Sequence, residues 1–425
     1  RIESLNTMIA SDFHGDVLGD MIDINPLELL GAAPTLHDIS IFRYLFADRI
    51  VERVRRDMGY DPLDIGLLRV VAGKPYASMR ATAFSFRPQG IPEHIYARMV
   101  DVYRRALTEN PSLQSRVEFD LYAMSCGDKL EHVMNEARLD EHDKSIVREA
   151  FARIDSIFLE VSAAQARLFA ANAHDYEQRT VSMDEESLEH ILEHIALGTE
   201  MFVRVARLAF YWRNKFEEAY PRENLNRLIA GHIKTVSGQM QADLVACRSS
   251  TITREELVRR YGHLRPGQFS IFGESYADDP DNYLFAPMEK AELGEAHKHS
   301  HVFENTTEFK NVVTFMQARE RMKFLFAQAL QLFATKLKRQ LAENNISPRD
   351  ASGVSWEKLL TCLHNRSELR ASHEKEVAVL LPDVLIPGVT DLRVITFAQA
   401  LPTYITSAVV KARICVLERP SAKVD

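Results

Sequence analysis

Apolar residues recur mostly every three or four positions through the middle of the chain, from about residue 128 to residue 339, with one two-turn step of seven between Phe315 and Met322. This spacing is typical of one face of an α-helix. The clearest runs are Ile146, Phe151, Ile154, Phe158 and Val161, then Leu188, Ile191, Leu192 and Ile195, then Phe315, Met322, Phe326, Leu330 and Phe333. The pattern predicts long amphipathic helices that bury their apolar stripes against one another, as in a helical bundle.

The first quarter of the chain has a different pattern, because glycine and proline divide it into short elements. Leu67–Ala72 and Tyr76–Phe86 are candidate strands, the second alternating loosely and rich in small residues. A helix is predicted over about residues 40–58, with Asp38 or Ser40 as its cap and Gly59 at its end.

The end of the chain is rich in residues that favour strands, in the runs Val377–Ile386, Leu392–Phe397 and Val409–Leu417. Pro382 lacks an amide hydrogen, so the first run is predicted to be an edge strand at best.

The fold class predicted from these patterns is mainly α. We expect a large helical, bundle-like body with a small β-containing N-terminal part and a β-rich C-terminal segment. The predicted boundaries are 1–125 for the mixed N-terminal part, 126–376 for the helical body and 377–425 for the β-rich segment.

Composition narrows the class of protein without naming a function. Of 425 residues, 46% are hydrophobic and 26% charged, which is ordinary for a globular protein and excludes wholesale disorder. The net charge of −8 argues against a protein that coats nucleic acid. Four cysteines lie far apart and suit a reducing cytoplasm, and no apolar run reaches the roughly 18 residues that suggest a membrane span. We therefore expect a cytoplasmic protein without nucleic-acid or membrane partners.

A compact turn at Tyr261–Gly267 (YGHLRPG) combines residues that can serve a ligand site. Glycine permits close backbone approach, His263 can titrate near neutral pH, and Arg265 can bind an anion. The alternative is a structural corner that holds a buried, hydrogen-bonded histidine. The residues alone leave both interpretations open.

Arg319 and Lys323 lie four positions apart in a helical run, so they project one turn apart. Two cations on one face can hold a phosphoryl group between them. The alternative is a solvated basic helix edge, which the pattern by itself favours.

Two histidine motifs raise the question of a metal. His190-Ile-Leu-Glu-His194 has the spacing of one class of zinc protease, and His297, His299 and His301 alternate in a polar segment. A polar helix face and a solvated loop explain them more simply, so no metal site is predicted. Signatures of a P-loop, a dinucleotide fold and a hydrolase elbow are absent from the sequence.

Several segments, taken in order, resemble phosphoenolpyruvate-synthase-like phosphotransferases, particularly the L-glutamine kinase subgroup linked to capsule and other cell-surface polysaccharide genes. Tyr261–Gly267 is similar to the YGHLRPG segment of that family and to its counterpart in rifampin phosphotransferases. The other matching segments are Gly19–Gly31, Ile41–Leu45, Met58–Tyr60, Gly73–Phe86, Val117–Phe119, Ile233–Val236, Arg319–Lys323 and Leu401–Thr406. The series departs from the family at Ile24, where tryptophan is usual.

The resemblance implies the central, acceptor-binding domain of an ATP-dependent phosphotransferase. In such enzymes an ATP-grasp domain uses ATP and Mg²⁺ to phosphorylate a histidine on a swivelling domain, which delivers the phosphoryl group to an acceptor. No signature of either domain occurs in this sequence, and its first residue is arginine, so we expect a part of a longer enzyme, without a cofactor of its own and inactive alone.

The resemblance also implies roles for particular residues. His263, Arg319 and Lys323 are the candidate catalytic residues. Tyr76, Arg80, Ser85 and Arg265 are candidates for binding the acceptor, which is expected to be a small molecule, with the amino acid L-glutamine as the candidate. The competing hypotheses are a non-catalytic helical module that binds a partner or spaces two mobile domains, and a zinc hydrolase that uses the 190–194 motif.

Overall fold

The computed structural model describes residues 23–24, 30, 34–48, 51–61, 67–71, 74–110, 127–229, 232–288, 303–365, 369, 384–387 and 392–395. Within these residues the protein is mainly helical, which confirms the predicted class. The predicted β-rich C-terminal segment is not confirmed as a whole, since only two of its short strands lie among the described residues.

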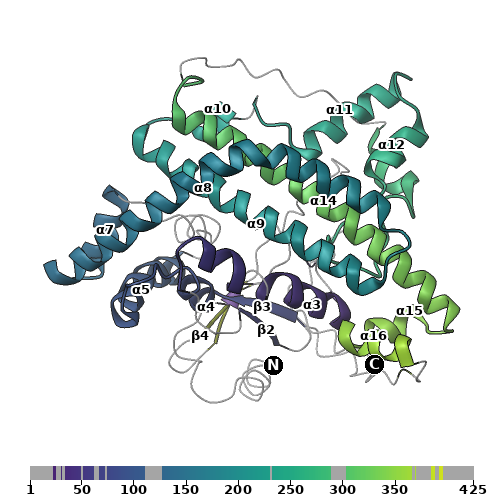
Figure 1. Ribbon diagram of the computed structural model, residues 1–425, viewed down its shortest axis with the longest axis horizontal. Helices are drawn as coiled ribbons and strands as arrows, with labels where there is room; N and C mark the ends of the chain where they lie inside the picture. Colours follow the sequence, from purple (N-terminus) through teal and green to yellow (C-terminus); the bar gives the residue numbers. More distant parts are fainter. Residues whose placement is uncertain are drawn as a thin grey trace, which may run out of the picture.

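Three long helices run alongside one another through the molecule (Figure 1). They are α8 (Glu141–Ser182), α9 (Leu188–Ala219) and α14 (Thr307–Glu343). The buried faces of α9 and α14 supply most of the main hydrophobic core, including the fully buried rings of Phe315 and Phe326. These are the helices that the three- and four-residue apolar spacing predicts.

Each long helix begins at a polar residue that satisfies a free backbone amide. Asp140, Ser187 and Thr306 precede α8, α9 and α14, and each side chain accepts a hydrogen bond from the amide three residues on. Such caps typically contribute about 1 kcal/mol each. Where α8 and α9 meet, a Cβ added to Gly198 would collide with the ring of Tyr176, so the two helices pack closely through a glycine.

A second core lies at one end of the bundle. It joins α4 (Met79–Phe84), α5 (Glu93–Glu109) and α7 (Asp128–Glu136) to the first turns of α8. Figure 1 shows α5 and α7 on this side of the molecule.

The N-terminal helical segment begins earlier than predicted. Thr35 and Asp38 form a reciprocal capping box, so α3 spans Leu36–Phe42 and continues as wider helical turns at Arg43–Asp48 (η1) and Val51–Arg55 (η2). Asp38 is therefore the third residue of the helix and not its cap. The predicted end at Gly59 is confirmed, because Gly59 adopts a φ of 84°, which favours glycine.

A small antiparallel sheet has the strand order β2-β3-β1-β4-β5. The strands are β1 (Asp23–Ile24), β2 (Leu68–Val71), β3 (Lys74–Ser78), β4 (Val384–Pro387) and β5 (Leu392–Ile395). β2 confirms the predicted strand at 67–72. The predicted strand at 76–86 is right only to Ser78, because the Ser78 hydroxyl accepts a bond from the Ala81 amide and starts α4.

The two C-terminal strands share this sheet with the N-terminal ones. β4 pairs with β1 on one side and with β5 on the other. The expectation of an edge strand is therefore wrong for residues 384–387. Pro382 itself, the predicted strand Val409–Leu417 and the motif His297–His301 lie outside the described residues.

A third, smaller core supports the helices beside the YGHLRPG turn. Leu225–Ile229 (α10) leads to α11 (Val236–Arg248) and α12 (Arg254–Tyr261), and the loop after α12 ends in the turns Asp281–Phe285 (η4) and Ala286–Met288 (α13). Met240, Leu244, Leu257 and Tyr261 pack together there with Ala327 of α14. After α14, the short helices α15 (Pro348–Ser352) and α16 (Trp356–Asn365) lie beside α3.

Candidate functional site

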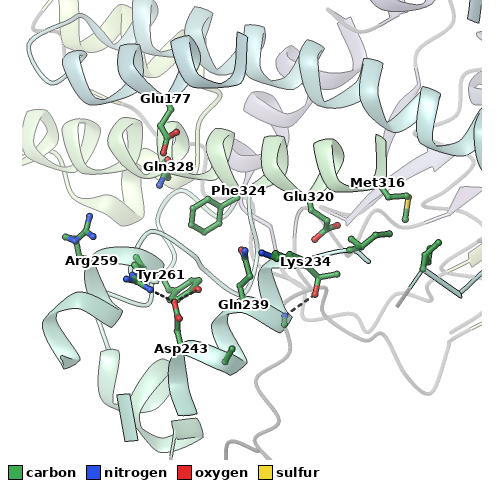
Figure 2. Close-up of a pocket in the computed structure, with 16 residues that line it drawn as sticks. Glu177, Lys234, Gln239, Asp243, Arg259, Tyr261, Met316, Glu320, Phe324 and Gln328 are labelled. Atoms are coloured by element: carbon green, nitrogen blue, oxygen red, sulfur yellow. Dashed lines mark hydrogen bonds and ion pairs between the residues drawn. The ribbon is translucent and has the colours of Figure 1, made fainter. Parts of the chain in front are cut away.

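A pocket of about 1020 Å³ lies between α14 and the pair α11 and α12 (Figure 2). Its lining is mixed, with cations, carboxylates, amides and apolar side chains. The lining residues are Glu177, Ile229, Ile233, Lys234, Thr235, Gly238, Gln239, Ala242, Asp243, Arg259, Arg260, Tyr261, Met316, Glu320, Phe324 and Gln328. A volume of this size accommodates a small organic molecule.

One wall of the pocket is a single stripe of α14. Met316, Glu320, Phe324 and Gln328 follow one another at intervals of four residues, which places them one above another on the same helix face. The opposite side of α14 is in the main core, where Met322 and Phe326 are fully buried. The wall is therefore held rigidly by the bundle.

The facing wall is hydrogen-bonded to α14 through the Gln317 side chain. The Gln317 amide oxygen accepts a bond from the Lys234 backbone amide at 2.7 Å, and its nitrogen donates to the Lys234 carbonyl at 3.1 Å. The next residue, Thr235, caps α11 by accepting a bond from the Gly238 amide at 3.0 Å. These contacts fix where the Lys234 side chain leaves the backbone, beside Gln317, which precedes Glu320 by about one turn of α14.

A charged network forms the end of the pocket beneath α12. Asp243 accepts hydrogen bonds from Arg260 at 2.8 Å and from the Tyr261 hydroxyl at 2.9 Å. Glu256 binds both Arg259 and Arg260, and these hydrogen bonds lower the pKa of Glu256 to about 2. Burial, followed by the bond to Asp243, raises the pKa of Tyr261, so its hydroxyl stays protonated and donates.

Two charged side chains in the pocket make fewer hydrogen bonds and ion pairs than the members of this network. Among the residues that the structure describes, the Lys234 ammonium makes no hydrogen bond or ion pair, and the Glu320 carboxylate has a single 3.3 Å contact from Arg319. Figure 2 shows Lys234 and Gln239 turned toward the same space as Glu320 and Phe324. The pocket therefore presents one positive and one negative group to a ligand.

His263 lies behind the pocket wall and not in it. Its ring meets the Phe324 ring edge-on, with the centroids 4.5 Å apart, and Nε2 has no hydrogen-bond partner among the described residues. Burial, and then the nearby Arg265 charge, lowers the pKa of His263 to about 3. The imidazole is consequently neutral near pH 7.

Arg265 holds the loop that follows α12. Its guanidinium donates to the carbonyls of Ser270 and Ile271, at 2.7 and 3.3 Å, and to the side chain of Gln331 on α14. Burial lowers its pKa to about 10, and the charges of Asp278 and Asp38 oppose that shift. In this structure the guanidinium is engaged by the protein's own backbone.

Arg319 and Lys323 do not line the pocket. The Arg319 guanidinium lies 5.8 Å from the ring centre of Phe202 and 5.9 Å from that of Phe210, both on α9. Lys323 is buried, and its carbonyl accepts a bond from Gln268 at 3.3 Å. Their role as a phosphoryl clamp stays a prediction.

The predicted acceptor-binding group on β3 and α4 also lies away from the pocket lining. Tyr76 and Ser85 are buried, and the Ser85 hydroxyl donates to the Thr82 carbonyl at 2.6 Å. The Arg80 guanidinium lies over the Phe84 ring at 5.2 Å. The structure keeps these residues together on neighbouring elements, and none of them is among the residues that line the described pocket.

The histidines of the 190–194 motif have different surroundings. His194 is buried, stacks on Tyr176 with the ring centres 4.0 Å apart, and bonds to the Thr180 hydroxyl at 2.8 Å. His190 is exposed and pairs with Glu186 at 2.9 Å. Across the described ranges no group of three histidine, cysteine or carboxylate side chains is placed to hold a metal ion.

Sequence reasoning gave no role to Lys234, Gln239, Asp243, Arg260 or Glu320, although two of them lie in segments that it singled out. The four-residue stripe of α14 was a usable signal for Glu320. No local signal identifies Lys234, because its position depends on Gln317, 83 residues away.

Comparison of the sequence with models of known protein families finds no match, and comparison with curated proteins finds none either. The resemblance to phosphoenolpyruvate-synthase-like enzymes thus stays a prediction. In the part of the chain that the structure describes, no helix has the length and apolar character needed to cross a membrane.

Proposed function

We propose that this chain is the acceptor-binding part of an ATP-dependent phosphotransferase of the phosphoenolpyruvate-synthase-like family, with a small acceptor, for which L-glutamine is the first candidate. ATP and Mg²⁺ would be bound by an ATP-grasp domain, and a swivelling domain would bring the phosphohistidine to the acceptor. Both domains would belong to the same full-length cytoplasmic enzyme.

One observation carries the proposal. Three segments that bear the resemblance lie far apart in the sequence, yet each contributes to the lining of one pocket. They are Ile233–Val236, which supplies Lys234, the segment that begins at Tyr261, and Arg319–Lys323, which supplies Glu320. A pocket built from these segments suits a domain that positions an acceptor.

Phosphoryl transfer requires little covalent participation from an acceptor-binding domain. Phosphoryl transfer from a phosphohistidine breaks the N–P bond and forms a bond from phosphorus to the acceptor, and it depends mainly on alignment and on cations near the phosphoryl oxygens. Lys234 is the pocket cation best placed to meet a ligand. His263 is neutral near pH 7, so it is not suited to neutralise negative charge, and its role in orienting a nucleophile stays a prediction because it lies behind the pocket wall.

The test is acceptor-dependent release of AMP from ATP by the enzyme translated from the complete reading frame. L-Glutamine should stimulate AMP release and become phosphorylated, and the 425-residue chain alone should release none. Other amino acids and simple sugars serve as the comparison panel. If no acceptor in the panel stimulates AMP release, the proposal is wrong.

The clamp prediction has its own variants in that assay. Arg319→Ala and Lys323→Ala should each abolish transfer while leaving ATP-dependent phosphorylation of the carrier histidine intact. Wild-type transfer rates in both variants would remove these residues from the mechanism and leave the acceptor pocket as the remaining functional site.

The alternative function is a helical module that spaces two mobile domains, and the long helices α8, α9 and α14, which lie side by side (Figure 1), are consistent with it. Calorimetric titration separates the two. A spacer binds no acceptor, whereas an acceptor-binding domain gives saturable heat with at least one member of the panel.

A further inference from the structure

We infer that the pocket recognises the zwitterionic head of a free α-amino acid, with Lys234 binding the carboxylate and Glu320 binding the ammonium group. This inference rests on the proposed function and specifies the residues that select an amino-acid acceptor. It differs from the sequence-based expectation, which gave the carboxylate to Arg80.

Lys234 is presented as a binding group and not as part of the scaffold. Both backbone polar groups of Lys234 are held by Gln317, which fixes the residue while leaving its side chain directed into the pocket. The other two pocket cations, Arg259 and Arg260, already bind Glu256, and Arg260 also binds Asp243. Of these three, Lys234 is the cation left to meet an incoming anion.

Glu320 provides the matching negative charge. Glu320 lies on the same side of α14 as Gln317, one turn further along. The Gln317 hydrogen bonds that hold the Lys234 backbone therefore also set the position of Lys234 relative to Glu320. Among the described residues no ion pair joins Lys234 to Glu320, so the two charges do not neutralise each other. The other pocket carboxylates are engaged elsewhere, Glu177 with Arg321 at 3.3 Å and Asp243 with Arg260.

The remainder of the lining suits a neutral, polar side chain. Phe324 and Met316 provide apolar surface for methylene groups, and Gln239 and Gln328 can exchange two hydrogen bonds with a carboxamide. A second full charge would find fewer complementary partners, because the arginines and carboxylates near Tyr261 already bind one another. The site therefore favours an uncharged amino acid with hydrogen-bonding capacity.

The experiment measures binding to the 425-residue chain by titration calorimetry with three related compounds. They are L-glutamine, 4-aminobutanamide, which lacks the α-carboxylate, and 4-carbamoylbutanoic acid, which lacks the α-amino group. Each is titrated into wild type, Lys234→Met and Glu320→Gln. Lys310→Met and Glu343→Gln, which alter exposed residues of α14 outside the pocket lining, are the matched controls.

Each charge-assisted contact should account for about tenfold to a hundredfold in affinity. Wild type should therefore bind both analogues that much more weakly than L-glutamine. Lys234→Met should weaken L-glutamine binding by the same factor but leave 4-aminobutanamide unchanged. Glu320→Gln should weaken L-glutamine binding but leave 4-carbamoylbutanoic acid unchanged, and both control variants should bind like wild type.

Other results separate the inference from the proposed function. Binding of L-glutamine that is insensitive to both pocket variants, or binding of a sugar in place of an amino acid, overturns the inference and leaves the phosphotransferase standing. Absence of binding by any panel member, together with absence of acceptor-dependent AMP release, overturns both. The crossed pattern of variants and analogues supports the inference directly.

Discussion

Asp38 joins the N-terminal helix to the loop that carries Arg265, and its replacement should be costly. One carboxylate oxygen accepts a bond from the Thr35 amide at 3.0 Å, and the other accepts from the Ile271 amide at 2.8 Å, 233 residues away. The side chain is fully buried, and burial raises its pKa, whereas the two amides and the Arg265 charge act in the opposite direction. Asp38→Ala removes all three interactions at once.

The magnitude follows from these contacts. A hydrogen bond to a charged group contributes about 1.5–3 kcal/mol, and the Ile271 amide would be left buried without its acceptor. Release of the desolvation cost of the carboxylate offsets part of the two bonds. We therefore expect Asp38→Ala to lower the free energy of unfolding by about 2–4 kcal/mol, measured by urea denaturation followed by circular dichroism.

Asp350→Ala is the matched control for this prediction. Asp350 is also the third residue of a capped helix and bonds to its cap residue Ser347 at 2.7 Å, but it lies at the surface. Its loss should cost only about 0.5–1 kcal/mol, as for an ordinary helix cap. Equal effects of the two substitutions would refute the argument that the long-range bond to Ile271 is what matters.

Three further predictions concern buried groups elsewhere. Gly198→Ala should destabilise the protein, although alanine favours helices by about 1 kcal/mol over glycine, because the added methyl meets the Tyr176 ring; a raised midpoint of thermal unfolding would contradict this. His263, with its pKa lowered to about 3 by burial, should show no NMR titration between pH 5 and 8, and its contribution to stability should be lost as the pH falls from 6.5 toward 3. Ser162→Ala removes the hydroxyl that accepts a bond from the Trp212 indole N–H at 2.8 Å, so it should lower the free energy of unfolding by about 1–3 kcal/mol. The tryptophan emission should shift as well, and an unchanged emission spectrum would contradict the prediction.

The periodic helices were the predictable part of the fold. Phe151, Ile154 and Phe158 are all buried on α8, as their spacing indicated. A helical apolar stripe is encoded locally and repeats several times, so one or two irregular positions do not hide it. The end of the N-terminal segment at Gly59 was predictable for a similar reason, since a single glycine conformation decides it.

The strand predicted at 76–86 shows where local reasoning fails. Small residues such as Ala81 and Ala83 suit a strand or a helix, and the deciding contact is the Ser78 hydroxyl bonded to the Ala81 amide. The pairing of β4 with β1 is equally invisible locally, because it joins residues about 360 positions apart. Such contacts are set by the packed whole and not by the sequence within either strand.

The candidate site was predictable as a set of segments but not as a set of contacts. The segment around Arg319 does reach the pocket, yet through Glu320 and not through Arg319 or Lys323. A helix presents successive residues about 100° apart, so a motif identified only by its position does not tell which of its side chains faces a ligand. Here α9 packs against the face of α14 that carries Arg319, so Arg319 contacts α9 and Glu320 faces the pocket.

The two walls of the pocket rest on different foundations. The α14 wall belongs to the largest core, whereas the α11 and α12 wall packs in a smaller core that includes Ala327 of α14 and is also tied to α14 by Gln317. A shift of α11 and α12 relative to α14 would change the width of the opening. Substitutions at the Gln317 tie offer a route by which such a protein can adapt to longer or shorter ligands while its main architecture stays constant.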